Sequence, residues 1–240
     1  MGFLGSSVSY AVKTNQVQPQ LPNIPGRLSR ALPLYLAERI ELASSARAQT
    51  LMPWLVAPDF LVTSHITQHP TEWIVELRVI GMSDARCLGE LSHSFALVAP
   101  GEAFNALAER LLSLLPDVTG ITPEPAPRTY ALPDANSLPQ YLLRLEQLLA
   151  LRCSAIEGVP AGFLHGEREI LQGNLELCLI FPRCVNIRLL FAQTLLAMNR
   201  IRPDILPEFA ERAARLQKEH PLVGPAQQRL QTLFDEAFAV

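Results

Sequence analysis

The stretch LPDVTGITPEPAPRTYALPDANSLP, residues 115–139, decides how this chain is organised. Six of its residues are proline. Because proline lacks a backbone N–H and pushes the residue before it towards extended geometry, such a stretch ends helices and strands. The sequence therefore predicts two folded domains, residues 1–116 and 137–240, joined by a proline-rich linker over residues 117–136.

Before the linker, several segments have the period-two hydrophobic pattern that is typical of strands. The expected elements, in chain order, are a strand at 6–12, a helix at 27–43, a strand or short helix at 49–56, strands at 59–67, 73–81 and 87–98, and a helix at 101–115. The turn signal MSDA at 82–85 predicts an antiparallel hairpin. If this helix begins late, Pro33 lies in its first turn, where proline is tolerated. The pattern predicts an α+β domain, a small mixed β-sheet with two or three helices on one face.

The segments APDFLVTSHIT (57–67) and EWIVELRVIG (72–81), followed by the amphipathic LAERLLSLL (107–115), carry a resemblance to a known family. In this order of elements, roughly residues 5–116 resemble the amino-terminal domain of TolB. The resemblance implies a small α/β protein-contact module of the kind found in bacterial periplasmic and signalling proteins. It carries over no catalytic residue.

After the linker, the hydrophobic pattern is helical throughout. The expected helices lie at 137–156, 162–182, 185–200, 205–221 and 226–240. Helices of about 15 residues joined by short, proline-marked turns predict an all-α antiparallel helical array.

Two segments of this array resemble one unit of a tetratricopeptide-like repeat: NIRLLFAQTLLAMNRI (186–201) and LPEFAERAARLQKEHP (206–221), with Ala192 as the small residue between helices. Pro182 and Pro221 each end a helix and lie 39 residues apart, against a period of about 34 in that family. The resemblance implies a degenerate array of about two and a half units, and such arrays present concave surfaces to partner proteins or peptides.

Composition excludes several classes of protein. With 49% apolar and 18% charged residues, the chain has enough apolar side chains for a large core and too little charge for a disordered protein. No window approaches the roughly 18 unbroken apolar residues of a membrane span. The net charge is −3 and the arginines are dispersed, which disfavours nucleic-acid binding.

The start, MGFLGSSVSY, lacks the basic region and the long apolar run of a signal peptide. We therefore expect a cytoplasmic protein. If the native chain begins earlier with a signal peptide, the expected compartment is the periplasm.

Histidine and cysteine spacing points to structural roles. His65 and His69 are four residues apart, but on a strand that spacing separates them by about 13 Å, too far to share one ion. His93 could lie across the hairpin, yet no set of carboxylates or thiols with metal-ligand spacing surrounds it. We expect surface or strand-end histidines and no metal.

The cysteines Cys153, Cys178 and Cys184 could meet as a thiol cluster, but without a CxxC motif core packing is favoured. The glycines form no phosphate-binding motif, and no GxSxG occurs. We expect no catalytic residue and no cofactor.

A polar stripe runs along the helix expected at 162–182. His165, Glu169, Gln172 and Glu176 recur at i, i+4, i+7 and i+11. A solvated face is the commonest meaning of such a stripe, a partner-contact face is the next, and an acid–base pair of His165 and Glu169 is geometrically feasible. Gly166 and Gly173 each cost a helix about 1 kcal/mol relative to alanine, which indicates close helix approach or a break at Gly166.

These features favour a non-enzymatic protein–protein interaction or scaffold protein whose partner is a protein or peptide, with His165, Glu169, Gln172 and Glu176 as its candidate contact residues. The alternative is a small-molecule sensor or enzyme with a site at the junction of the two domains. A third hypothesis is a homo-oligomer, because a mean hydropathy of +0.18 is high for a soluble monomer.

Overall fold

The computed structural model describes residues 1–10, 24–50, 57–96, 100–124, 138–154 and 166–239. These residues form two compact units, and the division falls inside helix α3 (Leu138–Ser154). The part of α3 up to Leu142 belongs to unit 1, and Leu143 begins the main part of unit 2. The second domain was expected to start at 137. In the structure, the first residues of this helix, 138–142, belong to unit 1.

Unit 1 contains a six-stranded mixed sheet and two long helices. Its elements are β1 (Gly2–Phe3), β2 (Ser7–Tyr10), α1 (Ile24–Ala43), β3 (Gln49–Thr50), β4 (Phe60–Gln68), β5 (Glu72–Gly81), β6 (Arg86–Ala96) and α2 (Pro100–Thr119). The strand order is β3-β1-β4-β5-β6, and β2 also pairs with β4. β1 and β2 run parallel to β4, whereas β4, β5 and β6 are antiparallel neighbours. The expected α+β class, mixed sheet and β5–β6 hairpin are confirmed.

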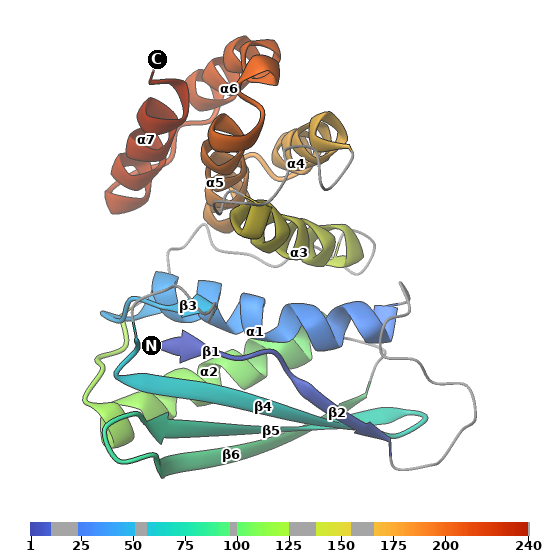
Figure 1. Ribbon diagram of the computed structural model, residues 1–240, viewed down its shortest axis with the longest axis vertical. Coiled ribbons are helices and arrows are strands. Elements are labelled where there is room, and N and C mark those ends of the chain that lie inside the picture. The colour runs from blue at the N-terminus through green and yellow to red at the C-terminus, as the bar shows by residue number, and fades with distance from the viewer. Residues whose placement is uncertain (11–23, 51–56, 97–99, 125–137, 155–165, 240) are drawn as a thin grey trace. The chain divides into compact units, whose positions relative to one another are not determined.

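The core of unit 1 lies between the sheet and the helices. On β5 the side chains alternate, so that Trp73, Val75, Leu77 and Val79 are buried while Glu76 between them is exposed. Both α1 and α2 lie over the buried face (Figure 1). This arrangement follows from the period-two pattern of the strand, which gives one face to the core and the other to water.

Two prolines occupy different places from those expected. α1 begins at Ile24, so Pro33 lies well inside the helix rather than in its first turn. α2 continues through Pro116 to Thr119, past the expected start of the linker at 117. Each proline removes one helical hydrogen bond. The buried leucines beside them, Leu32 and Leu115 among them, offset that loss.

The chain stays with unit 1 for a few residues after α2. The backbone N–H of Ser45 donates to the carbonyl of Thr122 (3.1 Å), and that of Glu124 donates to the carbonyl of Ala43 (2.8 Å). Residues 120–124 therefore pair with the end of α1, although the sequence pattern assigns them to the linker.

Unit 2 is helical among its described residues. Besides the rest of α3 it contains α4 (Glu167–Ile180), α5 (Val185–Ile201), a short 3₁₀ helix η1 (Pro203–Ile205), α6 (Pro207–Glu219) and α7 (Pro225–Phe238). α4 and α6 begin 40 residues apart, and so do α5 and α7. α4 contacts both α5 and α6, and α5 contacts α7. The helix starts therefore repeat after 40 residues, as a first pair in the chain (α4 and α5) and a second pair (α6 and α7), and each helix of the first pair contacts its counterpart in the second.

A buried arginine joins the two pairs. The Nη1 of Arg188, on α5, donates to the carbonyl of Pro182 after α4 and to the carbonyl of His220 after α6, both at 2.8 Å. Carbonyls at the ends of helices have no partner within the helix, so a side-chain donor there is stabilising. Arg188 thus holds the α4–α5 turn beside the chain that follows α6.

α4 is shorter than the helix expected at 162–182. It begins after Gly166, which has a left-handed backbone with φ of 102°. Residues 162–165 lie outside the described residues. The expected break at Gly166 is confirmed, because glycine adopts this conformation at little cost. In the part of the chain that the structure describes, no helix is long and apolar enough to cross a membrane.

Candidate functional site

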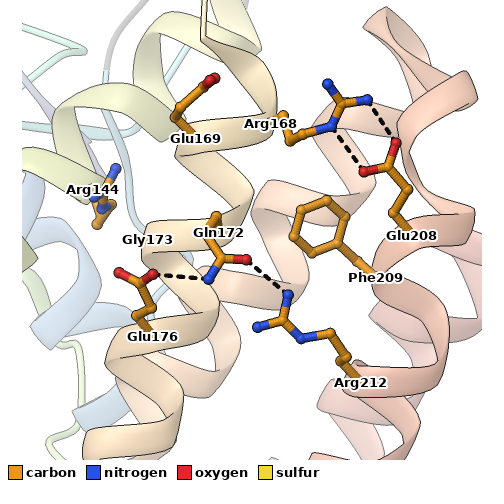
Figure 2. Close-up of a pocket in the computed structure, with 9 residues that line it drawn as sticks. All are labelled: Arg144, Arg168, Glu169, Gln172, Gly173, Glu176, Glu208, Phe209 and Arg212. Carbon is orange, nitrogen blue, oxygen red and sulfur yellow. Dashed lines mark hydrogen bonds and ion pairs between the residues drawn. The ribbon is translucent and has the colours of Figure 1, made fainter.

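A groove of about 460 Å³ lies between helices α3, α4 and α6 of unit 2. α4 lines it with Glu169, Gln172 and Glu176, three of the four residues in the expected polar stripe (Figure 2). The fourth, His165, lies outside the described residues. Because these positions are three or four residues apart, the helix presents them on one face.

Two contacts across the groove fix α4 against α6. Arg168 donates from Nε and Nη2 to the two carboxylate oxygens of Glu208, at 2.8 and 2.6 Å. Arg212 donates from Nη1 to the amide oxygen of Gln172 at 2.8 Å. Both contacts join residues 40 apart in the chain, the same spacing as the repeat of the helices. The hydrogen bonds with Glu208 raise the pKa of Arg168, and the same bonds lower the pKa of the Glu208 carboxyl.

Gln172 is central to the polar network of the groove. Its amide oxygen accepts from Arg212, and its amide nitrogen donates to Oε1 of Glu176 at 2.8 Å. Figure 2 shows this chain of three side chains running from α6 across α4. The network holds the Gln172 amide in one orientation and leaves the second oxygen of Glu176 available to a ligand.

Gly173 of α4 makes room for a side chain from α3. The guanidinium of Arg144, on α3, lies where any side chain at position 173 would begin, and a Cβ there would overlap with it. Arg144 also donates from Nη1 to the amide oxygen of Gln147 at 2.6 Å. The space left by the missing side chain at Gly173 is therefore taken by the long side chain of Arg144.

The lining of the groove carries charges of both signs. Three arginines and three glutamates line it, and the ring of Phe209 is buried against it from α6. Arg168 and Glu208 neutralise each other, whereas Glu169 and Glu176 are exposed and form no ion pair with another described residue. Its described lining holds no histidine, cysteine, serine or threonine, the side chains that most often act as nucleophile or imidazole base.

The histidines of unit 1 take part in local hydrogen bonds. His65 bonds through its two ring nitrogens to the hydroxyls of Ser7 (2.8 Å) and Ser9 (3.0 Å). His93 lies beside Arg110 of α2, with 3.3 Å between Nδ1 and Nη1. In the strand register His65 pairs with Glu76 and His93 with Val75, so the two rings lie on opposite faces of the sheet. Nowhere among the described residues do three histidine, cysteine or acidic side chains gather as metal ligands would.

The cysteines differ in burial. Cys178 is fully buried, and desolvation raises the pKa of its thiol to about 12. Cys184 is half-buried, and the same cause raises its pKa. Cys87 on β6 is exposed. The side chain of Cys153 lies outside those the structure describes. Cys178 therefore packs as a small apolar side chain of the core, the role the sequence favours.

The local hydrophobic pattern does not reveal the α3 and α6 sides of the groove. Arg168 and Glu208 carry opposite charges 40 residues apart, and Gln172 and Arg212 repeat that spacing. A search for polar pairs at the repeat length would have found both contacts. No comparable pattern in the sequence points to Arg144, because its place depends on how α3 packs beside Gly173.

No protein-family model matches this chain, and a comparison with curated proteins finds no match.

Proposed function

We propose that this chain is a non-enzymatic protein-binding protein, and that unit 2 holds a peptide segment of a partner in the groove between α3, α4 and α6. The observation that carries the proposal is the groove itself, where Glu169, Gln172 and Glu176 of one helix face meet Arg212 of another. Small-molecule pockets are mostly apolar. A groove lined by six charged side chains is better suited to the polar backbone and charged side chains of a peptide.

The repeated helix pairs support a tetratricopeptide-like array. α4 and α6 are the first helices of two pairs, and they lie side by side along the groove. In helical-repeat proteins the first helices of successive units commonly line a concave binding surface. The period of 40 is longer than the family's period of about 34, so the array we propose is a degenerate one.

Fixed side chains favour binding in this groove. The contacts of Arg168 with Glu208 and of Arg212 with Gln172 hold α4 and α6 in one register before a ligand arrives. Groups that are ordered beforehand lose less conformational entropy on binding. The groove therefore offers a peptide a preformed set of donors and acceptors.

Unit 1 is proposed to be a second contact module, similar to the amino-terminal domain of TolB. The support is the order of its elements, in which strands precede and follow α1 and the sheet ends before α2. In this proposal the chain is a scaffold that brings together what its two units bind.

Affinity isolation with a matched pair of variants tests the proposal. The tagged chain is compared with a groove variant, Gln172→Ala with Glu176→Ala, and with a control variant, Glu211→Gln, at an exposed site on α6 outside the groove. We expect the same partner protein with the wild type and the control, and its loss with the groove variant. Recovery of no partner, or of the same partner with all three, contradicts the proposal.

A further inference from the structure

We propose that the edge of the sheet along β6 is able to pair with the same edge of a second copy of this chain, and that Arg110 of α2 prevents this pairing in the wild type. The inference concerns unit 1 and is independent of the groove in unit 2. Two observations carry it, the backbone groups that β6 turns away from the sheet and the contact that Arg110 makes with one of them.

β6 is the outermost strand on its side of the sheet. In the described part of the chain its eleven residues pair with β5 alone (Figure 1). The free edge of a strand presents a row of backbone donors and acceptors to any further strand. An edge of this length therefore pairs with another strand unless something protects it.

The hydrogen bonds of the neighbouring strands show which backbone groups of β6 face outward. The N–H of Met82 donates to the carbonyl of Asp59 at 2.9 Å. The N–H of His69 donates to the carbonyl of Glu72, also at 2.9 Å, so the even-numbered residues of β5 bond to β4. The odd-numbered residues of β5 bond to β6, where their partners from 89 to 95 are odd-numbered as well. Because backbone groups alternate in direction along a strand, residues 90, 92 and 94 turn their N–H and C=O groups to the free edge.

Arg110 binds one of these outward groups. Its Nη1 donates to the carbonyl of Ser92 at 2.6 Å, which agrees with the outward direction of that carbonyl. The same Nη1 lies 3.3 Å from Nδ1 of His93. A guanidinium has donors only, so this ring nitrogen is the acceptor and helps to hold Arg110 beside the edge.

Burial agrees with an open edge. On β6 the side chains at 90, 92 and 94 are exposed, and Leu91 and His93 are half-buried. Val75 and Leu77, which pair with His93 and Leu91 on β5, are buried. The helices therefore cover β5 and leave β6 partly open to solvent.

The regular part of β6 is complementary to itself. In a two-fold antiparallel pair centred on Ser92, this serine lies opposite Ser92 of the second copy, and Glu90 lies opposite Ser94. Serine hydroxyls donate to each other and to a carboxylate, and such cross-strand pairs are stabilising. On the other face Leu91 lies opposite His93. This register pairs residues 89–95 with themselves, brings no two like charges of the strand together and allows about six backbone hydrogen bonds.

Arg110 opposes this pairing in two ways. It occupies the carbonyl of Ser92, the acceptor at the centre of the register. The two-fold axis would also bring the exposed Arg110 of each copy to the same place, where two guanidinium groups repel each other. Charged side chains commonly protect edge strands in this manner.

Light scattering of full-chain variants over a range of protein concentrations tests the proposal. Arg110→Ala removes both the donor and the charge, and should lower the dissociation constant of the dimer about tenfold or more relative to the wild type. Arg110→Lys keeps a charged donor and should behave as the wild type does. Arg47→Ala is the matched control, because it removes an exposed arginine of unit 1 outside β6 and α2, and it should change nothing.

A pair of substitutions at position 94 locates the interface. The N–H of Ser94 faces outward, so Ser94→Pro removes a donor that β5 does not use. In the Arg110→Ala background Ser94→Pro should abolish the dimer, whereas Ser94→Ala keeps the N–H and should not. The fluorescence of Trp73, which is buried in unit 1, checks that each variant is folded.

Amide hydrogen exchange followed by NMR reports on the edge residue by residue. The amides of Leu91 and His93 bond to β5 and should be protected in every variant. The amides of residues 90, 92 and 94 should exchange rapidly in the wild type and at least about tenfold more slowly in the Arg110→Ala dimer.

The proposal is overturned if Arg110→Ala keeps the mass and the exchange rates of the wild type, or if its dimer persists with Ser94→Pro. A wild type that dimerises through β6 as strongly as Arg110→Ala would show that Arg110 does not protect the edge, which also overturns it. Slow exchange at residues 90, 92 and 94 without a dimer would show that another segment of the same chain covers the edge, with the same consequence.

Discussion

The guanidinium of Arg144 on α3 fills the space that a side chain at Gly173 on α4 would need. We expect Gly173→Ala to force the guanidinium away and to destabilise unit 2 by about 1–3 kcal/mol, the usual cost of overpacking. Urea unfolding followed by helical circular dichroism measures the change. In an Arg144→Ala background the same substitution should be neutral or stabilise by about 1 kcal/mol, because alanine is the better helix former. Equal destabilisation in both backgrounds would contradict the contact.

Arg188→Met should loosen the connection between the two helix pairs. The substitution leaves the carbonyls of Pro182 and His220 without the donor they share, and an unsatisfied buried carbonyl costs about 1–3 kcal/mol. We expect a lower urea midpoint for unit 2 and faster amide exchange around residues 220–224. An unchanged midpoint would show that these carbonyls find other donors.

The pair of Arg168 and Glu208 should make unit 2 sensitive to acid. The hydrogen bonds from Arg168 hold the pKa of Glu208 below its ordinary value of 4.5. The unfolded chain therefore binds this proton at a higher pH than the folded chain does. The contribution of the pair to stability is complete above pH 4.5 and is lost as the pH falls through the pKa of Glu208 in the folded chain. Glu208→Gln should flatten the pH dependence of unfolding in this range. A variant with the wild-type pH profile would show that the ion pair adds nothing.

His93 should make unit 1 less stable in mild acid. Burial, and then the charge of Arg110, lower the pKa of His93 from its ordinary value of 6.5. Its contribution to stability is therefore complete above pH 6.5 and falls as the pH drops through the folded pKa. Tryptophan fluorescence reports on this unit, because both tryptophans, Trp54 and Trp73, belong to its part of the chain. His93→Gln should remove this loss of stability. If the variant still loses stability in mild acid, another titratable group is responsible.

The thiols should react at very different rates. Cys87 is exposed, whereas burial raises the pKa of the Cys178 thiol to about 12 and keeps it protonated near neutral pH. Because the thiolate is the reactive form, a thiol-specific reagent should modify Cys87 in the folded protein and Cys178 only after unfolding. Mass spectrometry of peptides from the wild type and from Cys87→Ser assigns each site. Rapid labelling of Cys178 in the native protein would contradict its burial.

Local patterns predicted much of the fold. The buried face of β5 was predicted from the alternation of Trp73, Val75, Leu77 and Val79. The polar face of α4 was predicted from the spacing of Glu169, Gln172 and Glu176. Both depend on neighbouring residues in the chain, so the sequence carries them directly.

The features of the fold that local patterns did not predict depend on tertiary contacts. The local pattern placed Pro33 near the start of its helix and Pro116 after the end of its helix, but burial of the leucines beside them keeps each helix continuous. The α6 side of the groove and the place of Arg144 come from packing between helices. A local pattern contains no information on which helix lies opposite.

Photochemical crosslinking tests the central claim most directly. A photoreactive phenylalanine derivative is placed in the groove at Gln172, or outside it at Glu211, and the full chain is irradiated in its source cells. The groove account predicts a covalent adduct with one partner protein from position 172 and none from position 211. An equal adduct from both positions, or no adduct from position 172 while the same partner is still retained by the chain, would contradict it.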